Sequence, residues 1–204
     1  MACIIFGAGS YYGLAERPSP EDYMIAADGG WRYCRQENLV PDLLLGDFDS
    51  LAQIPEFDHI HRVPVEKDDT DMMLAVKEGL ARGQREFHLY GGMGGTRSDH
   101  TLANLQALLY LTRHGAHGWL YGDRERYTAI RDETICFPAR QQGILSVFCA
   151  GADAHGVSIS GAQYTLENAV LTADFPLGVS NHFVGEPITV SVDKGSLIIG
   201  LLDK

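Results

Sequence analysis

The sequence predicts an α/β domain over residues 1–127, followed by a small all-β sandwich domain over residues 128–204. In the first part, short apolar runs alternate with stretches of helical spacing, which is typical of a mostly parallel sheet covered by helices on both faces. After about residue 128 the helical spacing disappears, and short apolar runs are separated by Gly, Pro, Asp and Asn. That second pattern favours an antiparallel sandwich.

The first domain contains apolar runs that predict strands at 4–7, 23–30, 43–50, 61–67, 86–92 and 119–123. Two stretches between them, 71–83 and 101–115, have apolar residues at helical spacing and end in glycine. Together they indicate a Rossmann-like sheet with flanking helices.

The second domain contains six short runs that predict strands, at 133–137, 144–150, 156–161, 164–173, 187–192 and 196–202. The Asp-Lys-Gly segment at 193–195 separates the last two runs and favours a hairpin there. We place the domain boundary near Tyr127, where the spacing changes.

The composition excludes some classes of partner. The net charge of −11 argues against nucleic acid or an anionic membrane as the main partner, because both need basic patches. No apolar run approaches the roughly 18 residues of a membrane span, and the N-terminus lacks the pattern of a signal peptide. The four cysteines form no CxxC pair, so we expect reduced thiols in a cytoplasmic protein.

Acidic and glycine-rich clusters follow several of the predicted strands. They are Asp28, the pair Asp47 and Asp49, the segment 68–71 and the segment 91–100. Because the carboxyl ends of parallel strands share one edge of a sheet, where ligands bind, we expect these clusters to converge.

The residue types in these clusters suit a metal-bound polyphosphate. Carboxylate oxygens suit Mg²⁺, and alternation along a strand puts Asp47 and Asp49 on the same side. Thr70 and Asp71 begin a predicted helix, where free backbone amides favour anions. Glycines allow a nucleotide to approach the backbone closely, and Arg97 offers a guanidinium fork for phosphate.

Each cluster also has a plainer interpretation. Asp68 or Thr70 caps a helix, GDFDS at 46–50 forms a solvated turn, the glycines form a loop, and His100 caps or packs in a helix. The functional interpretation depends on their conjunction. Other motifs are absent: there is no P-loop and no GxSxG elbow, and the segment 6–13 misses the GxGxxG spacing by one residue.

Four blocks occur in a characteristic order: ADGG at 27–30, GDFDS at 46–50, KDDTD at 67–71 and GGTRSDHTLANL at 94–105. With the two-part layout, they resemble the thiamine pyrophosphokinase family over nearly the whole chain. The resemblance implies that the chain transfers a diphosphoryl group from ATP to the hydroxyl of thiamine, giving thiamine diphosphate and AMP. It also implies Mg²⁺, thiamine and ATP as ligands, and a homodimer.

The resemblance implies three groups of site residues. The metal ligands are Asp28, Asp47, Asp49 and Asp71, of which the last three are the catalytic candidates; which carboxylate accepts the hydroxyl proton stays open, with Asp71 as a candidate. The nucleotide-binding residues are Asp28, Asp68, Thr70, Gly92, Gly94, Gly95, Arg97, Asp99 and His100. The residues for thiamine, in a β-domain site at the dimer interface, are Tyr164, Ser180 and Asn181.

Three positions depart from the family pattern. Thr96 lengthens the loop before Arg97, Trp31 stands where a small residue is usual, and Tyr164 replaces a tryptophan. The last change favours one alternative, a related pyrophosphokinase for another hydroxymethyl heterocycle such as a pterin. A second alternative is a non-catalytic nucleotide or thiamine sensor, which loss of the metal carboxylates would indicate, but all the matching aspartates are present. An α/β protein with solvated acidic loops is the plainest alternative.

Overall fold

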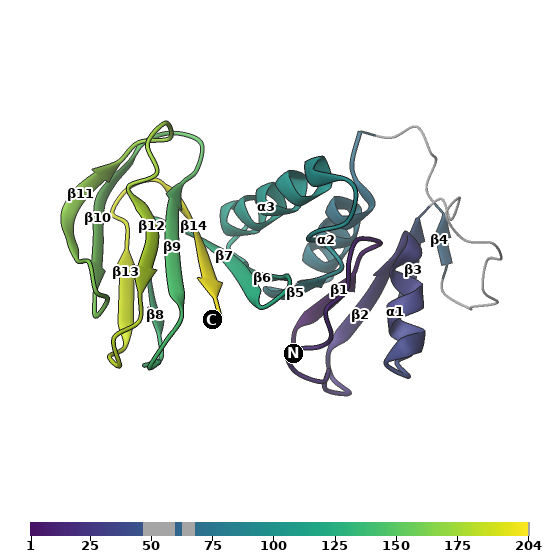
Figure 1. Ribbon diagram of the computed structural model, residues 1–204. Coiled ribbons are helices and arrows are strands. Elements are labelled where there is room, and N and C mark those ends of the chain that lie inside the picture. The colour runs from purple at the N-terminus through teal and green to yellow at the C-terminus, as the bar shows by residue number, and fades with distance from the viewer. Residues whose placement is uncertain (47–59, 63–67, 204) are drawn as a thin grey trace. The chain divides into compact units, whose positions relative to one another are not determined.

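The computed structural model describes residues 1–46, 60–62 and 68–203, which fall into two compact units, Met1–Gly122 and Asp123–Lys204 (Figure 1). The described chain is mostly sheet with few helices. Parallel strands lie in the first unit and antiparallel strands in the second, as the sequence predicts. The predicted boundary near Tyr127 falls inside the first strand of the second unit.

The first unit contains a parallel sheet with the strand order β4-β3-β2-β1-β5-β6. Its strands are β1 (Cys3–Phe6), β2 (Tyr23–Ala27), β3 (Leu43–Gly46), β4 (Ile60–Arg62), β5 (Glu86–Tyr90) and β6 (His117–Tyr121). The chain builds the sheet in one direction from β1 to β4 and then continues on the other side of β1 with β5. Strands β1 and β5 are therefore neighbours, although they are far apart in the sequence.

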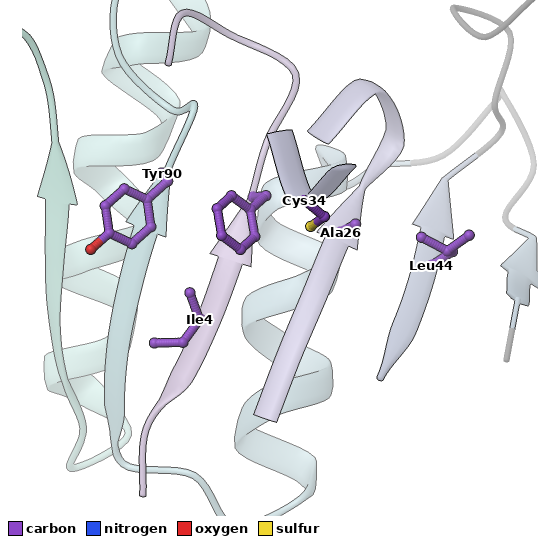
Figure 2. Close-up of a cluster of buried hydrophobic side chains, with 6 residues drawn as sticks. Ile4, Ala26, Cys34, Leu44 and Tyr90 are labelled. Carbon is purple, nitrogen blue, oxygen red and sulfur yellow. The ribbon is translucent and has the colours of Figure 1, made fainter. Parts of the chain in front are cut away.

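Helices cover both faces of this sheet. Successive side chains of a strand point to opposite faces, and because nearly all of them are apolar, both faces need to be covered. Cys34 of α1 (Trp31–Gln36) packs on one face in a buried cluster that Figure 2 shows, with Ile4, Phe6, Ala26, Leu44 and Tyr90. On the other face, Gly79 of α2 (Asp71–Ala81) lies against Cys3 and Phe87.

The remaining helices are the short 3₁₀ helix η1 (Asp28–Gly30) and α3 (Ser98–Arg113). Helix α3 begins three residues before the predicted segment because its first turn is polar, and α1 is too short to show helical spacing in the sequence. None of the helices in the described ranges is long and apolar enough to cross a membrane.

The second unit contains two antiparallel sheets, ordered β12-β9-β14-β7 and β11-β10-β13-β8. The strands are β7 (Glu125–Arg131), β8 (Thr134–Phe137), β9 (Ile144–Cys149), β10 (Ala154–Ser160), β11 (Leu166–Leu171), β12 (Gly178–His182), β13 (Ile188–Ser191) and β14 (Ser196–Leu202). The hairpin predicted at 193–195 is wrong, because β13 pairs with β8 and β10 whereas β14 pairs with β7 and β9. The turn carries the chain from one sheet to the other.

We expect the cysteines to differ sharply in reactivity. Cys3 and Cys34 are buried, and burial raises the pKa of each thiol to about 12, whereas Cys136 is exposed. The thiolate is the reactive form, so a thiol reagent at pH 8 should label Cys136 quickly and the two buried cysteines only after unfolding. The raised pKa values favour the neutral thiols in the fold, so their contribution to stability is lost as the pH rises from about 8.5 towards 12.

Mass spectrometry of labelled peptides measures this difference directly, with Cys136→Ser as the control that removes the fast site. Equal labelling rates at Cys3 and Cys136 in the native protein would contradict the packing of α1 and α2 on the sheet.

Candidate functional site

A pocket of about 790 Å³ lies at the carboxyl ends of the parallel strands in the first unit. Its walls come from the loops after β1, β2 and β5 and from the first turns of α2 and α3. Eight of the residues singled out from the sequence line it, and they are Asp28, Thr70, Asp71, Gly92, Gly94, Gly95, Arg97 and His100. Three clusters that are distant in the sequence therefore share one cavity.

The other predicted residues of this site are placed differently. Asp68 and Asp99 do not line the pocket, while Asp47 and Asp49 lie outside the described residues. Over residues 1–46, 60–62 and 68–203, no three acidic, histidine or cysteine side chains are grouped to hold a metal ion.

Two glycine-containing loops, one after β1 and one after β5, lie against each other in the wall of the pocket because β1 and β5 are adjacent strands. The backbone amide of Gly7 donates to the Tyr90 carbonyl at 2.8 Å, and that of Gly9 donates to the Gly91 carbonyl, also at 2.8 Å. Gly91 has a φ of 63°, and a Cβ there would lie 2.3 Å from the Gly7 carbonyl oxygen. Only glycine permits this contact, which brings the two loops together at the wall of the pocket.

The acidic side of the pocket is formed at the ends of β2 and at the start of α2. Asp28 follows β2 in a left-handed conformation with φ of 48° and is 9% exposed. Asp71 is the first residue of α2, where the unpaired amides of the first turn favour an anion. Asp69 also lines the pocket, and its carboxylate accepts from Lys77 Nζ at 2.7 Å and 2.8 Å.

Thr70 caps helix α2, since its Oγ1 accepts a hydrogen bond from the Met73 amide at 3.1 Å. We expect Thr70→Val to lower the free energy of unfolding by about 1 kcal/mol, the usual cost of losing such a cap. Thr70→Ser keeps the hydroxyl and should restore most of the loss. Urea unfolding of both variants measures the difference, and equal stability of the serine and valine variants would contradict the capping role.

Arg97 and Asp99 form an ion pair at the start of α3. Arg97 Nε lies 3.0 Å from Asp99 Oδ1, and this hydrogen bond lowers the pKa of the Asp99 carboxyl to about 2. The Arg97 side chain lines the pocket, whereas Asp99 does not. The carboxylate therefore orients the guanidinium rather than lining the cavity itself.

The pocket also contains residues that the sequence reasoning missed. They are Gly7, Ala8, Gly9, Ser10, Tyr33 and Asn104, together with the less polar Ala27 and Met72; Asp69, Gly91 and Thr96 also line the pocket and belong to the predicted segments 68–71 and 91–100. The segment 7–10 follows a predicted strand and obeys the rule applied to the other clusters, but it was set aside because it misses a dinucleotide fingerprint. Asn104, which is buried, donates from Nδ2 to the Gly92 carbonyl at 2.7 Å, and only the packing of α3 reveals this role.

In the second unit, Tyr164 and Asn181 are held together. The Tyr164 amide donates to Asn181 Oδ1 at 2.9 Å, and Asn181 Nδ2 donates to the Tyr164 carbonyl at 2.6 Å. Asn181 is buried, whereas the Tyr164 side chain is 62% exposed. Ser180 is exposed, with φ of 62°, and its amide donates to Ser146 Oγ at 3.1 Å. The arrangement presents the Tyr164 ring to solvent on a fixed backbone.

Comparisons with known proteins point to one family for both units. Residues 16–120 match the model "Thiamin pyrophosphokinase, catalytic domain", and residues 132–197 match "Thiamin pyrophosphokinase, vitamin B1 binding domain". The chain is 28% identical over 189 residues to a thiamine pyrophosphokinase of Bacillus subtilis, covering 86% of this chain and 85% of that protein.

Solved structures share the fold over the full length. A Bacillus subtilis thiamine pyrophosphokinase structure is 22% identical with a TM-score of 0.87, and an Enterococcus faecalis thiamin pyrophosphokinase family protein is 25% identical with a TM-score of 0.84. In both comparisons 100% of each chain is covered. The thiamin pyrophosphokinase of Candida albicans matches at 12% identity, a TM-score of 0.76, and 99% and 90% coverage of this chain and that one.

Proposed function

The chain belongs to the thiamin pyrophosphokinase family, and from this we infer that it is an enzyme that transfers a diphosphoryl group from ATP to the hydroxyl of thiamine. The products are thiamine diphosphate and AMP. The observation that carries the proposal is that both family domains match in order, over 16–120 and 132–197. It is supported by one pocket in the first unit, which seven of the nine predicted nucleotide-binding residues line.

We propose that the first unit, as a Rossmann-like nucleotide-binding domain, holds ATP in this pocket. The glycine loops present backbone to the polyphosphate, and Arg97, oriented by Asp99, compensates part of its charge. The hydroxyl oxygen of thiamine attacks the β-phosphorus, and the bond to the AMP oxygen breaks with its electron pair leaving on AMP. Asp71 accepts the hydroxyl proton. Such a transfer depends mainly on alignment and charge compensation.

Mg²⁺ fits the oxygen donors of this pocket. The ion commonly takes one or two protein carboxylates and completes its shell with water and substrate phosphates. Asp28 and Asp71 line the same cavity and would hold it, together with Asp47 and Asp49 from the segment outside the described residues. When bound, the ion neutralises charge on the polyphosphate.

We propose that the second unit recognises thiamine and that Tyr164 stacks on one of its rings. An exposed aromatic ring on a backbone fixed by Asn181 offers a rigid face to a cationic heterocycle. Ser180 lies beside Asn181 and would contribute its hydroxyl.

The chain is also proposed to form a homodimer. Val179 of β12 and Phe148 of β9 are 39% and 37% exposed, and these strands are neighbours because Gly178 pairs with Val147. Leu177, just before β12, is 49% exposed. Such exposed apolar groups favour a partner surface. Sedimentation velocity tests this proposal, and a purely monomeric species at micromolar concentration would contradict it.

A cytoplasmic location is proposed from the four free cysteines, and cell fractionation tests it.

The deciding experiment is a coupled AMP-release assay with ATP, Mg²⁺ and thiamine, run beside thiamine-free and pterin-alcohol reactions. We expect AMP to appear only with thiamine, together with an equal amount of thiamine diphosphate. AMP release with the pterin alcohol alone would reassign the acceptor. Absence of AMP with every acceptor, with ATP bound tightly, would favour a sensor.

We expect Tyr164→Ala to raise the KM for thiamine about tenfold while changing the KM for ATP less than twofold, because the variant loses a stacking face of about 1–2 kcal/mol. Tyr164→Phe keeps the ring and should resemble the parent enzyme. Steady-state kinetics with each substrate varied in turn makes the measurement. An unchanged thiamine KM in the alanine variant would remove Tyr164 from the acceptor site.

A further inference from the structure

The loop after β1, residues 7–10, forms a wall of the pocket, and all of its residues line the cavity. On one side it is tied to the β5 loop: Gly7 and Gly9 donate to the carbonyls of Tyr90 and Gly91, and Ser10 forms a bridge with Met93. These contacts hold the loop to the sheet, but they leave its other edge to be fixed by another element.

Tyr33 of α1 fixes that edge. Its hydroxyl donates a hydrogen bond to the Gly9 carbonyl, and its side chain lines the pocket. Gly9 thus has both backbone polar groups bonded, the amide to the β5 loop and the carbonyl to Tyr33. Ala8 and Ser10, on either side of Gly9, line the same cavity.

The Tyr33 ring is itself held in place. It stacks on the Tyr11 ring, with centroids 4.7 Å apart and planes inclined by 23°. The Tyr11 hydroxyl donates to Glu37 Oε1 at 2.8 Å, and the Tyr11 ring also packs against Phe6 and Tyr90 of the sheet. Burial and the Glu37 carboxylate raise the pKa of the Tyr11 hydroxyl well above its usual range, so that it stays a donor.

We propose that Tyr33 is a positioning residue that fixes the β1 loop at the nucleotide side of the pocket and thereby sets the affinity for ATP without affecting that for thiamine. The inference rests on the proposed function, since it assigns the pocket to ATP. A loop whose carbonyl is already bonded needs less ordering when a ligand binds, and preorganisation of this kind raises affinity. Tyr33 acts through Gly9 and does not itself take part in the transfer.

The test removes a single hydroxyl. Tyr33→Phe keeps the ring stacked on Tyr11 but loses the bond to Gly9. A hydrogen bond of ordinary strength changes an equilibrium constant by about three- to tenfold. We therefore expect the KM for ATP, and the dissociation constant for ATP with Mg²⁺ from calorimetry, to rise by about that factor, with kcat and the thiamine KM within twofold of the parent enzyme.

Tyr127→Phe is the matched control. It also removes one tyrosine hydroxyl from a side-chain hydrogen bond, the 3.0 Å bond from Tyr127 to Glu125 Oε2, but it lies in the second unit and outside the pocket. We expect ATP affinity in this variant to equal that of the parent enzyme. A merely structural role for Tyr33 would instead lower the melting temperature of Tyr33→Phe and leave ATP affinity unchanged.

Two outcomes overturn the inference and separate it from the proposed function. In the first outcome, the parent protein turns over ATP and thiamine, but Tyr33→Phe has the parental affinity for ATP or loses affinity for both substrates equally. The positioning role of Tyr33 is then wrong, while the proposed function stands. If the parent protein neither binds ATP nor releases AMP, the proposed function is wrong and the inference is overturned with it.

Discussion

Asp71→Asn is expected to lower kcat at least about a hundredfold while leaving the fold intact, since loss of a carboxylate at a site of charge compensation or proton transfer typically has that effect. Asp71 lines the pocket at the first position of α2, and asparagine has the same size. The Thr70 cap is unchanged, and loss of the favourable interaction of the charge with the helix dipole is expected to cost about 0.5 kcal/mol. Steady-state kinetics and a thermal melt make the two measurements.

Glu86→Gln is the matched control for that charge change. Glu86 begins β5 and is exposed at the opposite, amino edge of the same parallel sheet. It should retain parental turnover with ATP and thiamine. Equal activity of Asp71→Asn and the parent enzyme would exclude Asp71 from both of its proposed roles.

Gly91→Ala is expected to lower the free energy of unfolding by about 3 kcal/mol or more and to abolish ATP binding, because overpacking at a backbone contact forces the chain apart. A Cβ at Gly91 would stand 2.3 Å from the Gly7 carbonyl oxygen. The two glycine loops would have to separate, and the bond from the Gly9 amide to the Gly91 carbonyl would be lost.

Gly115→Ala provides a close control, since Gly115 has a φ of 64° against 63° at Gly91 but has no atom within 4 Å of an added Cβ. This variant isolates the cost of an L side chain in the left-handed region, about 1–2 kcal/mol, and should bind ATP normally. Calorimetry and urea unfolding of both variants give the comparison. If both lose the same stability and both bind ATP, the close contact between the loops is not required.

Part of the site could be predicted from the sequence because its residues follow a geometric rule. The carboxyl ends of parallel strands share one edge, so Asp28, Asp71 and the loop at 91–95 were expected to converge, and they line one pocket. The same rule applies to residues 7–10, which follow β1. They were not chosen as site residues because the segment was compared only with the GxGxxG motif, which it does not match. The actual constraint on that loop is its closeness to Gly91, which depends on β1 and β5 being neighbours.

Long-range hydrogen bonds could not be predicted in the same way. The sequence reasoning assigned Asn181 only to thiamine and gave no sign that its amide oxygen and nitrogen bond to the Tyr164 backbone. The hairpin at 193–195 was expected from local turn chemistry, but strand pairing there is set by contacts with β7, β8, β9 and β10. In both cases the competing partner lies far along the chain and leaves no local signal.

The sequence by itself determined the order of parallel and antiparallel parts, the acidic and glycine-rich clusters and the family. The matches to the two thiamin pyrophosphokinase domains confirm the family. These features are local in the chain, since periodicity, turn residues and short motifs can be recognised without knowing what they contact. Only the tertiary structure decided that Tyr33 bonds to Gly9 and that Asn104 bonds to Gly92. Each depends on the direction of a side chain after packing, and that direction is fixed when helices settle on a sheet.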